Sequence, residues 1–174
     1  MINFVVLNES PHQSFAQTLY TSAFEADERR EFSQIFTLTT RNDFRFYVLE
    51  DSQSPIAILA LWNFETFCYI EHFAVDNNLR NGGRGTTIIQ DIISKSQNPI
   101  VLEVELPMTP MAQRRIRFYE RLGFVLLPFD YFQPPYSPDK KPVAMHIMTT
   151  DTTPFNHQRF ETIKQTLYNK VYNY

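Results

Sequence analysis

The sequence predicts an α/β fold, in which helices and strands alternate along the chain and pack around one sheet. Two observations predict it. Apolar runs typical of strands alternate with amphipathic patterns typical of helices. In addition, three of the four glycines, Gly82, Gly83 and Gly85, fall within four positions, between a strand-like run and a helical pattern. The chain therefore places an unusual backbone conformation where a strand passes into a helix.

Seven segments are expected to be strands. Residues 56–62 are nearly all apolar, so this strand is expected to be buried on both faces. In 100–106 the apolar residues alternate with Glu103 and Glu105, which places both carboxylates on the minority face. The seven ranges are 4–7, 44–49, 56–62, 67–75, 100–106, 124–129 and 143–148.

Helices are expected between these strands. Serine or threonine followed by proline marks three helix starts, at Ser10, Thr109 and Thr153. Gly123 is the expected stop of the helix over 111–122. A charged turn at 24–30 leads into a further helix, and its charges are expected on a solvated face. The remaining helix follows Gly85.

Composition limits the classes of protein. With 174 residues and 43% hydrophobic residues, the chain is expected to form one domain with a sizeable core. A net charge of −3 argues against partners such as nucleic acid or an anionic membrane. The single cysteine, Cys68, excludes an internal disulfide and fits a reducing compartment. Because no signal peptide or membrane-spanning run is apparent, a cytoplasmic protein is expected.

The glycine-rich segment 75–86 predicts a phosphate-binding turn. A glycine turn before a helix directs backbone N–H groups, and the positive end of the helix dipole, at an anion. A P-loop would need a lysine after the last glycine, and the dinucleotide fingerprint would need a third glycine three positions after the second. Neither is present. What remains is Arg-x-x-Gly-x-Gly at Arg80, Gly83 and Gly85. The alternative is a glycine-rich turn without a ligand.

This pattern resembles the pyrophosphate-binding motif of the GNAT superfamily, the acetyl-coenzyme A-dependent N-acetyltransferases. A second stretch, Phe118-Tyr119 with Gly123-Phe124 four residues later, is similar to the second GNAT motif. The resemblance covers about 44–148 and implies a mixed, largely antiparallel central sheet of about seven strands with helices on both faces. It further implies a splay at the central parallel pair. The expected organisation is one N-acetyltransferase domain over 1–174, with its core at about 44–149 and a C-terminal helical extension at about 153–172.

The resemblance implies acetyl-coenzyme A as co-substrate. The backbone of 81–86 would hold the pyrophosphate, and the main chain of Phe73 to Val75 would pair with the pantetheine arm. Many family members have an asparagine seven residues before the tyrosine and an alanine four before it, where this chain has Ala112 and Arg115. Arg114 or Arg115 is the expected replacement for that asparagine. The expected coenzyme-binding residues are Phe73, Ala74, Val75, Arg80, Asn81, Gly82, Gly83, Arg84, Gly85, Thr86, Arg114 and Arg115.

Three residues are the candidates for catalysis. Tyr119 matches the family tyrosine that protonates the departing thiolate, and a buried core tyrosine is the alternative. An amine acceptor must lose a proton before it attacks, and Glu103 or Glu71 is the expected base. Alternation places Glu71 on the face of Phe73, with His72 packed on the other face. The alternative is that these carboxylates face solvent or only bind the acceptor.

The acceptor site is expected at the segment 131–136, in which three aromatics and two prolines would form a stiff surface. Glu28, in the charged turn, would form the facing wall. The expected acceptor-binding residues are therefore Glu28, Tyr131 and Tyr136, and a segment that packs on its own domain is the alternative. No histidine and cysteine cluster has metal-ligand spacing, so no metal is expected.

Together these features predict an N-acetyltransferase. The acetyl group would pass from acetyl-coenzyme A to an amine of a small molecule or peptide by direct attack in a ternary complex. The alternative is a non-catalytic acyl-coenzyme A-binding module of the same fold that senses or regulates. A nucleic-acid binder that uses the arginine-rich helix fits the net charge poorly. The oligomeric state, monomer or homodimer, stays open.

Overall fold

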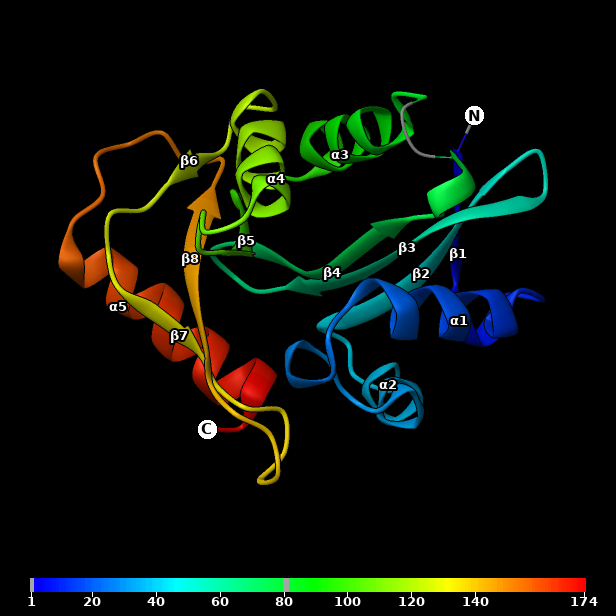
Figure 1. The fold of residues 1–174 in the computed structure, drawn as a ribbon, viewed down its shortest axis with the longest axis horizontal. Coiled ribbons are helices and arrows are strands. Elements are labelled where there is room, and N and C mark those ends of the chain that lie inside the picture. The colour runs from blue at the N-terminus through cyan, green and yellow to red at the C-terminus, as the bar shows by residue number, and fades with distance from the viewer. Residues whose placement is uncertain (1, 80–81) are drawn as a thin grey trace.

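The computed structural model describes residues 2–79 and 82–174, so the predicted coenzyme contacts of Arg80 and Asn81 lie outside the described residues. Helices and strands alternate as expected (Figure 1). The strands are β1 (Ile2–Val6), β2 (Phe44–Asp51), β3 (Ser54–Asn63), β4 (Cys68–Val75), β5 (Ile100–Glu105), β6 (Val125–Leu126), β7 (Tyr131–Gln133) and β8 (Val143–Thr149). The helices are α1 (Gln13–Ala23), α2 (Phe32–Leu38), α3 (Arg84–Lys95), α4 (Pro110–Glu120) and α5 (His157–Leu167).

The strands form one mixed, largely antiparallel sheet, as predicted. Their order is β1-β2-β3-β4-β5-β8-β6, and β7 pairs with β8 beside that path. β4 and β5 are parallel, and the other pairs are antiparallel. The sheet has eight strands instead of about seven, because part of the segment expected as an acceptor loop forms β7.

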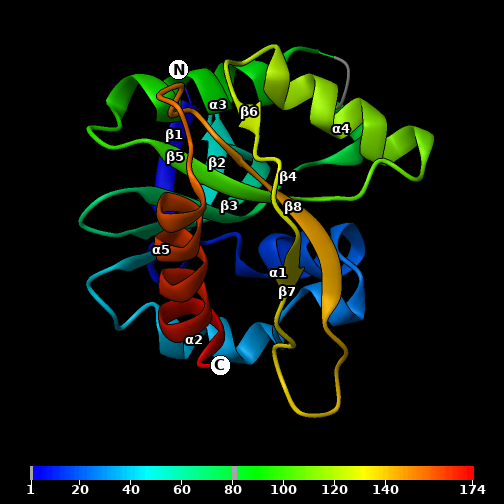
Figure 2. The same ribbon diagram turned by 90° about the vertical axis from the view of Figure 1, so that its left-hand side faces the viewer.

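Helices cover both faces of the sheet, which confirms that expectation. Figures 1 and 2 show α3 and α4 on one face and α1 and α2 on the other, with α5 running beside β7 and β8. Each face has its own apolar cluster. The one under α1 and α5 contains Tyr20, Trp62 and Phe160, and the one under α3 and α4 contains Ile88 and Phe124. The structure contains no helix long and apolar enough to cross a membrane within residues 2–79 and 82–174.

The parallel pair separates early, as expected for a splayed sheet. β4 pairs with β5 only from Cys68 to Ile70, opposite Ile100 to Leu102. Beyond these three positions β4 continues along β3 and β5 continues along β8. The two central strands therefore diverge from Glu71 and Glu103 onward, and a gap opens in the middle of the sheet.

A β-bulge changes the predicted facing of Glu71. On β3, Leu61 pairs with Ile70 and Ala60 pairs with His72, so Glu71 has no opposite residue. The extra residue reverses the alternation on β4. The prediction that Glu71 shares a face with Phe73 and lies opposite His72 is therefore wrong. The Glu71 carboxylate accepts a hydrogen bond from the Trp62 indole N–H at 2.7 Å, on the α1 side of the sheet.

His72 lies on the same side as Glu71 and is packed, as predicted. Its ring makes edge contacts with Tyr20 and Phe24, at centroid distances of 4.9 Å and 4.5 Å. Phe73, in contrast, belongs to the cluster on the α3 side of the sheet. The bulge thus places two polar side chains next to each other on one face, where strict alternation would have separated them.

Arg30 is the buried partner of Glu71. Its side chain is 9% exposed and that of Glu71 is 1% exposed, and Arg30 Nε and Nη2 each lie 3.1 Å from Glu71 Oε1. The Arg30 guanidinium also lies 4.6 Å from the centroid of the Tyr136 ring. The prediction that the charges of this turn are solvated is therefore wrong for Arg30.

Other element boundaries differ for local reasons. The first helix begins at Gln13, because the Ser10 hydroxyl accepts from the His12 N–H in a short turn before it. The last helix is capped by Asn156 instead of Thr153, whose N–H donates to Asp151. β6 is short, and the chain reaches Pro128, which lacks an N–H for a ladder, soon after it. Thr109 caps α4 as predicted. The helix ends at Glu120, two residues earlier than expected, with Arg121 as its C-cap, and Gly123 follows in the expected left-handed conformation.

Replacing Arg30 by methionine is expected to destabilise the protein, because it leaves the buried Glu71 carboxylate without its cation. The expected loss is about 3–5 kcal/mol in the free energy of unfolding, measured by denaturant unfolding. Arg30 holds the pKa of Glu71 below its ordinary value of 4.5. The advantage of the wild type is therefore fully present above pH 4.5 and shrinks as the pH falls through the lowered pKa.

Arg29→Met is the matched control, since it removes a neighbouring arginine that does not contact Glu71 in the described residues. Adding Glu71→Gln to Arg30→Met is expected to restore part of the stability. Equal losses in Arg29→Met and Arg30→Met would contradict a specific buried pair.

Candidate active site

The gap between β4 and β5 forms a cleft of about 830 Å³. Both faces of the sheet contribute to its walls. Phe24, at the end of α1, lies on one side, and Phe118 and Tyr119 of α4 lie on the other. The remaining walls come from the end of α1, from β4 and the turn after it, from the glycine turn and the start of α3, from β5, and from α4 and its C-cap. They contain Ala23, Ile70, Glu71, Phe73, Ala74, Val75, Asn77, Leu79, Gly83, Arg84, Gly85, Thr86, Leu102, Glu103, Met111, Arg114, Arg115 and Arg121.

The glycine turn presents the N-terminus of α3 to the cleft. Gly83 is the N-cap and has φ +72°, a left-handed conformation that favours glycine. The first helical hydrogen bond runs from Thr87 N–H to Gly83 O, so the N–H groups of the first turn have no acceptor within the helix. Gly85, unlike Gly83, has no positive φ that would favour glycine. A Cβ at Gly85 would also meet only ordinary contacts with the protein, the nearest at 3.6 Å from the Phe118 ring. Its missing side chain leaves the backbone open to the cleft.

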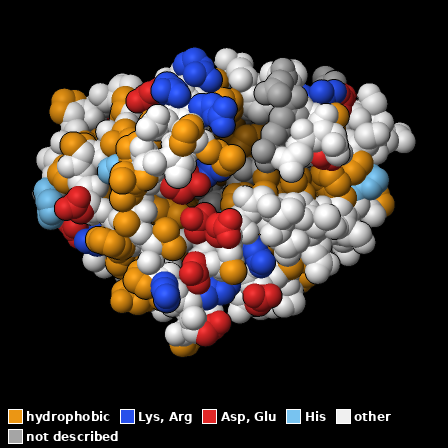
Figure 3. Space-filling model, in the orientation of Figure 1, with side chains coloured by type: hydrophobic (Ala, Val, Ile, Leu, Met, Phe, Trp, Pro, Cys, Tyr) orange, Lys and Arg blue, Asp and Glu red, His pale blue; other side chains and the backbone are white. Residues whose placement is uncertain are grey.

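Arginines surround the same end of the cleft. Arg84, Arg114, Arg115 and Arg121 all line it. Arg84 lies 3.8 Å from Asp51, and Arg115 forms an ion pair with Glu105. Figure 3 shows basic side chains at the top of this face, on the side of α3 and α4, and acidic side chains in its middle. The helix dipole and the guanidinium groups together favour an anion at this end.

Tyr119 lies near the C-terminal end of α4 and lines the cleft together with the arginines of that helix. Its ring packs against Phe118 and Phe124, at centroid distances of 5.1 Å and 5.4 Å. Burial, with a smaller effect of Glu105, raises the pKa of the hydroxyl to about 12, although Arg115 acts in the opposite direction. Tyr119 therefore stays protonated at neutral pH, and it lines the cleft.

Glu103 follows Leu102, the last residue of β5 that pairs with β4, and it lines the cleft from the α5 side. Tyr131 donates to Oε1, while Gln133 Nε2 and the Tyr172 hydroxyl donate to Oε2 at 2.7 Å and 2.8 Å. Burial raises the pKa of Glu103 above its ordinary value, and these donors offset part of that effect. A carboxylate with a raised pKa in a cleft has the properties of a general base.

Glu71 occupies the corresponding position on β4, but its chemistry differs. Burial raises its pKa, but Arg30, His72 and Trp62 oppose this more strongly, and the net pKa is lowered. Its carboxylate is committed to Arg30 and Trp62. The structure thus brings the two predicted bases to the same level of the sheet, and their surroundings push the two pKa values apart.

Comparison with known proteins identifies the family. The model of the acetyltransferase (GNAT) family matches residues 12–124. The chain belongs to the GNAT family. Its fold is similar to that of a protein from Bacteroides thetaiotaomicron assigned to the GNAT acetyltransferases, with 34% identity, a TM-score of 0.91, and coverage of 100% of this chain and 99% of that one. A search of curated proteins gave no match.

More distant GNAT structures share the fold. One is Arabidopsis thaliana NAA60 in complex with acetyl-coenzyme A, at 13% identity and TM-score 0.64, covering 86% of this chain and 96% of that one. Another is spermidine N-acetyltransferase from Vibrio cholerae in complex with coenzyme A and spermine, at 17% identity and TM-score 0.62, covering 85% and 94%. At these identities the likeness concerns the fold alone.

Within this GNAT fold, the predicted coenzyme-binding residues that the structure describes gather at one cleft. Phe73, Ala74 and Val75 lie on β4 beyond its pairing with β5, and they pair with β3 on the other side. Arg84, Gly85 and Thr86 begin α3. Gly82 is exposed and directly precedes Gly83.

The residues predicted to bind the acceptor are placed differently from one another. Tyr131 and Tyr136 are only 2% and 8% exposed, so the expectation of a gripping surface loop is wrong. β7 and β8 hold Tyr131 against Glu103, and Tyr136 packs against Arg30 and Tyr172. Glu28 is half-buried, and burial together with the charge of Glu105 raises its pKa. No described residue donates a hydrogen bond to the Glu28 carboxylate, so among the three predicted acceptor-binding residues Glu28 is the one that can still bind a ligand.

Several polar residues at the GNAT site were not predicted. Arg30 and Trp62 hold Glu71, and Gln133 and Tyr172 hold Glu103. They come from four separate parts of the chain. No local pattern connects them. The pairing of β3 with β4 brings Trp62 to Glu71, and the chain between α1 and α2 brings Arg30. The pairing of β7 with β8 brings Gln133 to Glu103, and the return of the C-terminus brings Tyr172.

Proposed function

We propose that this protein transfers the acetyl group of acetyl-coenzyme A to an amine nitrogen of a small molecule or peptide. The observation that carries the proposal is that one cleft is lined by the glycine turn, Tyr119 and Glu103. An anion site, a protonated hydroxyl and a carboxylate of raised pKa are the three groups that direct acyl transfer to an amine requires.

The coenzyme would approach from the α3 and α4 side of the sheet. Its pyrophosphate would lie against the first turn of α3, with Arg84, Arg114 and Arg115 nearby, and Arg80 and Asn81 remain proposed contacts. The pantetheine arm would extend along Phe73 to Val75. A main-chain N–H of β4 would polarise the thioester carbonyl. The complexes of NAA60 and of the Vibrio cholerae enzyme with acetyl-coenzyme A or coenzyme A support this choice of co-substrate.

The amine would approach from the α1 side, where Glu28 offers a carboxylate for a cationic group. Glu103 would take one proton from the ammonium, and the nitrogen lone pair would then attack the thioester carbonyl carbon. As the C–S bond breaks, Tyr119 would give its proton to the sulfur. The attached nitrogen would lose a further proton, which would restore the Tyr119 hydroxyl, and Glu103 would release its proton to solvent. The net products are the acetylated amine, the free thiol of coenzyme A and one proton. A single domain, a cytoplasmic location, and a monomer or homodimer remain predictions.

Gly85→Val is expected to prevent coenzyme binding while the protein stays folded. A valine side chain would occupy the space in which the main chain meets the pyrophosphate, whereas its Cβ meets only ordinary contacts with the protein. The affinity for acetyl-coenzyme A, measured by calorimetry, should fall at least about tenfold. Thr87→Val, on an exposed position two residues later, is the control. Unchanged affinity in folded Gly85→Val would place the coenzyme elsewhere.

Tyr119→Phe is expected to lower turnover by about 100-fold, because it removes the proton donor and keeps the ring. Coenzyme affinity and stability should stay close to those of the wild type. Release of free thiol with a panel of amines measures turnover, and Tyr47→Phe, away from the cleft, is the control. A loss of stability with turnover within a few-fold would make Tyr119 a core residue. Binding without turnover by the wild type would favour the non-catalytic module.

Glu103→Gln is expected to lower kcat/KM by about 100-fold and to flatten the acidic limb of its pH profile. The raised pKa of Glu103 means that the wild-type base is protonated, and inactive, at the acidic end of that limb. Glu71→Gln should lower stability and leave the position of the limb unchanged, because Glu71 is committed to Arg30. If both variants keep the wild-type profile, another group removes the proton.

A further inference from the structure

The π-helical turn Tyr168–Tyr172, here called the C-terminal turn, continues α5 and returns to the centre of the protein. Val171 and Tyr172 are 1% and 6% exposed, and both belong to the apolar cluster on the α1 side of the sheet. Asn173, which follows, has a left-handed backbone with φ 55° and ends the turn. The turn is therefore part of the core that lies behind the cleft.

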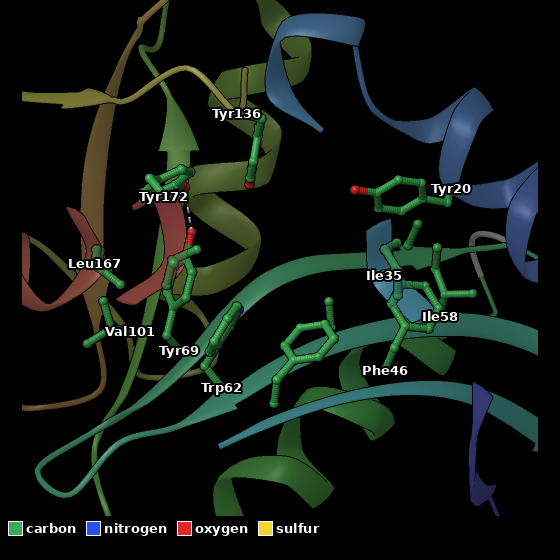
Figure 4. Packing of buried hydrophobic residues seen from close by; sticks show 14 of the residues in the cluster. Tyr20, Ile35, Phe46, Ile58, Trp62, Tyr69, Val101, Tyr136, Leu167 and Tyr172 are labelled. Atoms are coloured by element: carbon green, nitrogen blue, oxygen red, sulfur yellow. Dashed lines mark hydrogen bonds between the residues drawn. The ribbon is translucent and has the colours of Figure 1, made fainter. Parts of the chain in front are cut away.

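Two neighbouring residues of this turn contact the surroundings of both candidate bases. The Tyr172 hydroxyl donates to Glu103 Oε2 at 2.8 Å and lies 3.1 Å from the Tyr69 hydroxyl. The Val171 carbonyl accepts from Arg30 Nη2 at 2.5 Å, and Arg30 binds Glu71. Figure 4 shows the hydroxyls of Tyr172 and Tyr69 meeting beside Tyr136, above Trp62.

We propose that Tyr172 is a positioning residue, which holds the Glu103 carboxylate in place for proton transfer and makes the C-terminal turn a part of the acceptor side of the site. The catalytic part of this inference rests on the proposed acetyl transfer. Neither the family match, which ends at residue 124, nor the two sequence motifs include this turn.

The geometry of Glu103 shows why a positioning group is needed. Its side chain leaves β5 where β4 no longer flanks it, so backbone pairing on that side does not limit its movement. Tyr131 fixes one oxygen, and Gln133 and Tyr172 fix the other from two different elements. Tyr131 and Gln133 both belong to β7, so Tyr172 is the one of these three donors that comes from outside the sheet.

The same contact affects the pKa of Glu103. A hydrogen bond donated to the ionised form stabilises it, so loss of the Tyr172 hydroxyl should raise the pKa further. The titratable groups that face Glu103 are Tyr69 on β4, Tyr131 on β7, Tyr136 after it, and Tyr168 and Tyr172 on the turn. Glu28 faces it from the chain between α1 and α2. The tyrosines stay neutral at the pH of the test, because burial raises their pKa values.

Tyr168 offers a matched control within the same turn. Its hydroxyl donates to the Phe132 carbonyl at 2.6 Å and so anchors the turn to β7 without reaching Glu103. Tyr168→Phe and Tyr172→Phe thus each remove one hydroxyl from the C-terminal turn. Tyr168→Phe removes one hydrogen bond, and Tyr172→Phe removes the bond to Glu103 and the contact with the Tyr69 hydroxyl. A purely structural role would give the two variants similar effects, and a positioning role would separate them.

The first measurement follows Glu103 directly and needs no turnover. Carboxyl ¹³C NMR of labelled protein gives the titration of Glu103, with its signal assigned by its absence from Glu103→Gln. Tyr172→Phe should move the titration to higher pH, and Tyr168→Phe should leave it in place. An unmoved titration in Tyr172→Phe, or an equal movement in both variants, would overturn the proposal.

The second measurement is the pH profile of kcat/KM for an accepted amine. In Tyr172→Phe the acidic limb should move to higher pH by about one unit, a loss of about tenfold on that limb. Coenzyme affinity should stay unchanged, and Tyr168→Phe should follow the wild type. A moved titration with an unmoved limb would overturn the catalytic role. Absence of turnover with every amine would refute the proposed function, and the titration would still decide whether Tyr172 positions Glu103.

Discussion

The early divergence of β4 from β5 is the constraint on which the site depends. Two parallel strands that paired along their full length would close the sheet and leave no access to their backbones. Here the ladder ends after three positions, and the next residue on each strand is a glutamate. The opening exposes the main chain of β4 to the cleft and lets α4 bring Tyr119 to the same place. The two carboxylates and the β4 main chain are therefore positioned by strands that have stopped pairing with each other.

The open gap leaves two carboxylates in a buried place, and the free energy of removing them from water must be offset by hydrogen bonds and charges from neighbouring elements. Carboxylates at the point of divergence lose water, and each needs partners from elements outside the parallel pair. Glu71 obtains a cation, Arg30, from the chain between α1 and α2. Glu103 obtains three neutral donors from β7 and the C-terminal turn. Burial raises the pKa of both carboxylates. At Glu71 the cation, with smaller help from His72 and Trp62, outweighs this effect and the net pKa is lowered, whereas at Glu103 the neutral donors offset only part of it and the pKa stays raised.

The sequence predicted the features that depend on neighbouring residues along the chain, such as the ends of helices. The concentration of glycines between a strand and a helix indicated an unusual backbone there, which the structure places at the left-handed N-cap Gly83, and Gly123 indicated where α4 stops, to within two residues. The facing of Glu71 could not be predicted, because a bulge depends on the register between two strands. Nothing in the neighbourhood of Arg29 and Arg30 shows which of them is buried. Tyr131 and Tyr136 lie in a proline-containing stretch with the composition of a loop. Pairing with β8 places Tyr131 inside, and packing against Arg30 and Tyr172 places Tyr136 inside.

The cleft is bounded by residues from both faces of the sheet, Phe24 on one side and Phe118 on the other. Basic side chains lie toward α3 and α4, and acidic side chains lie in the middle of the same face (Figure 3). In the proposed transfer, two ligands of opposite charge would therefore meet different parts of the lining. The polarity of the walls would sort the two ligands before either makes a specific contact.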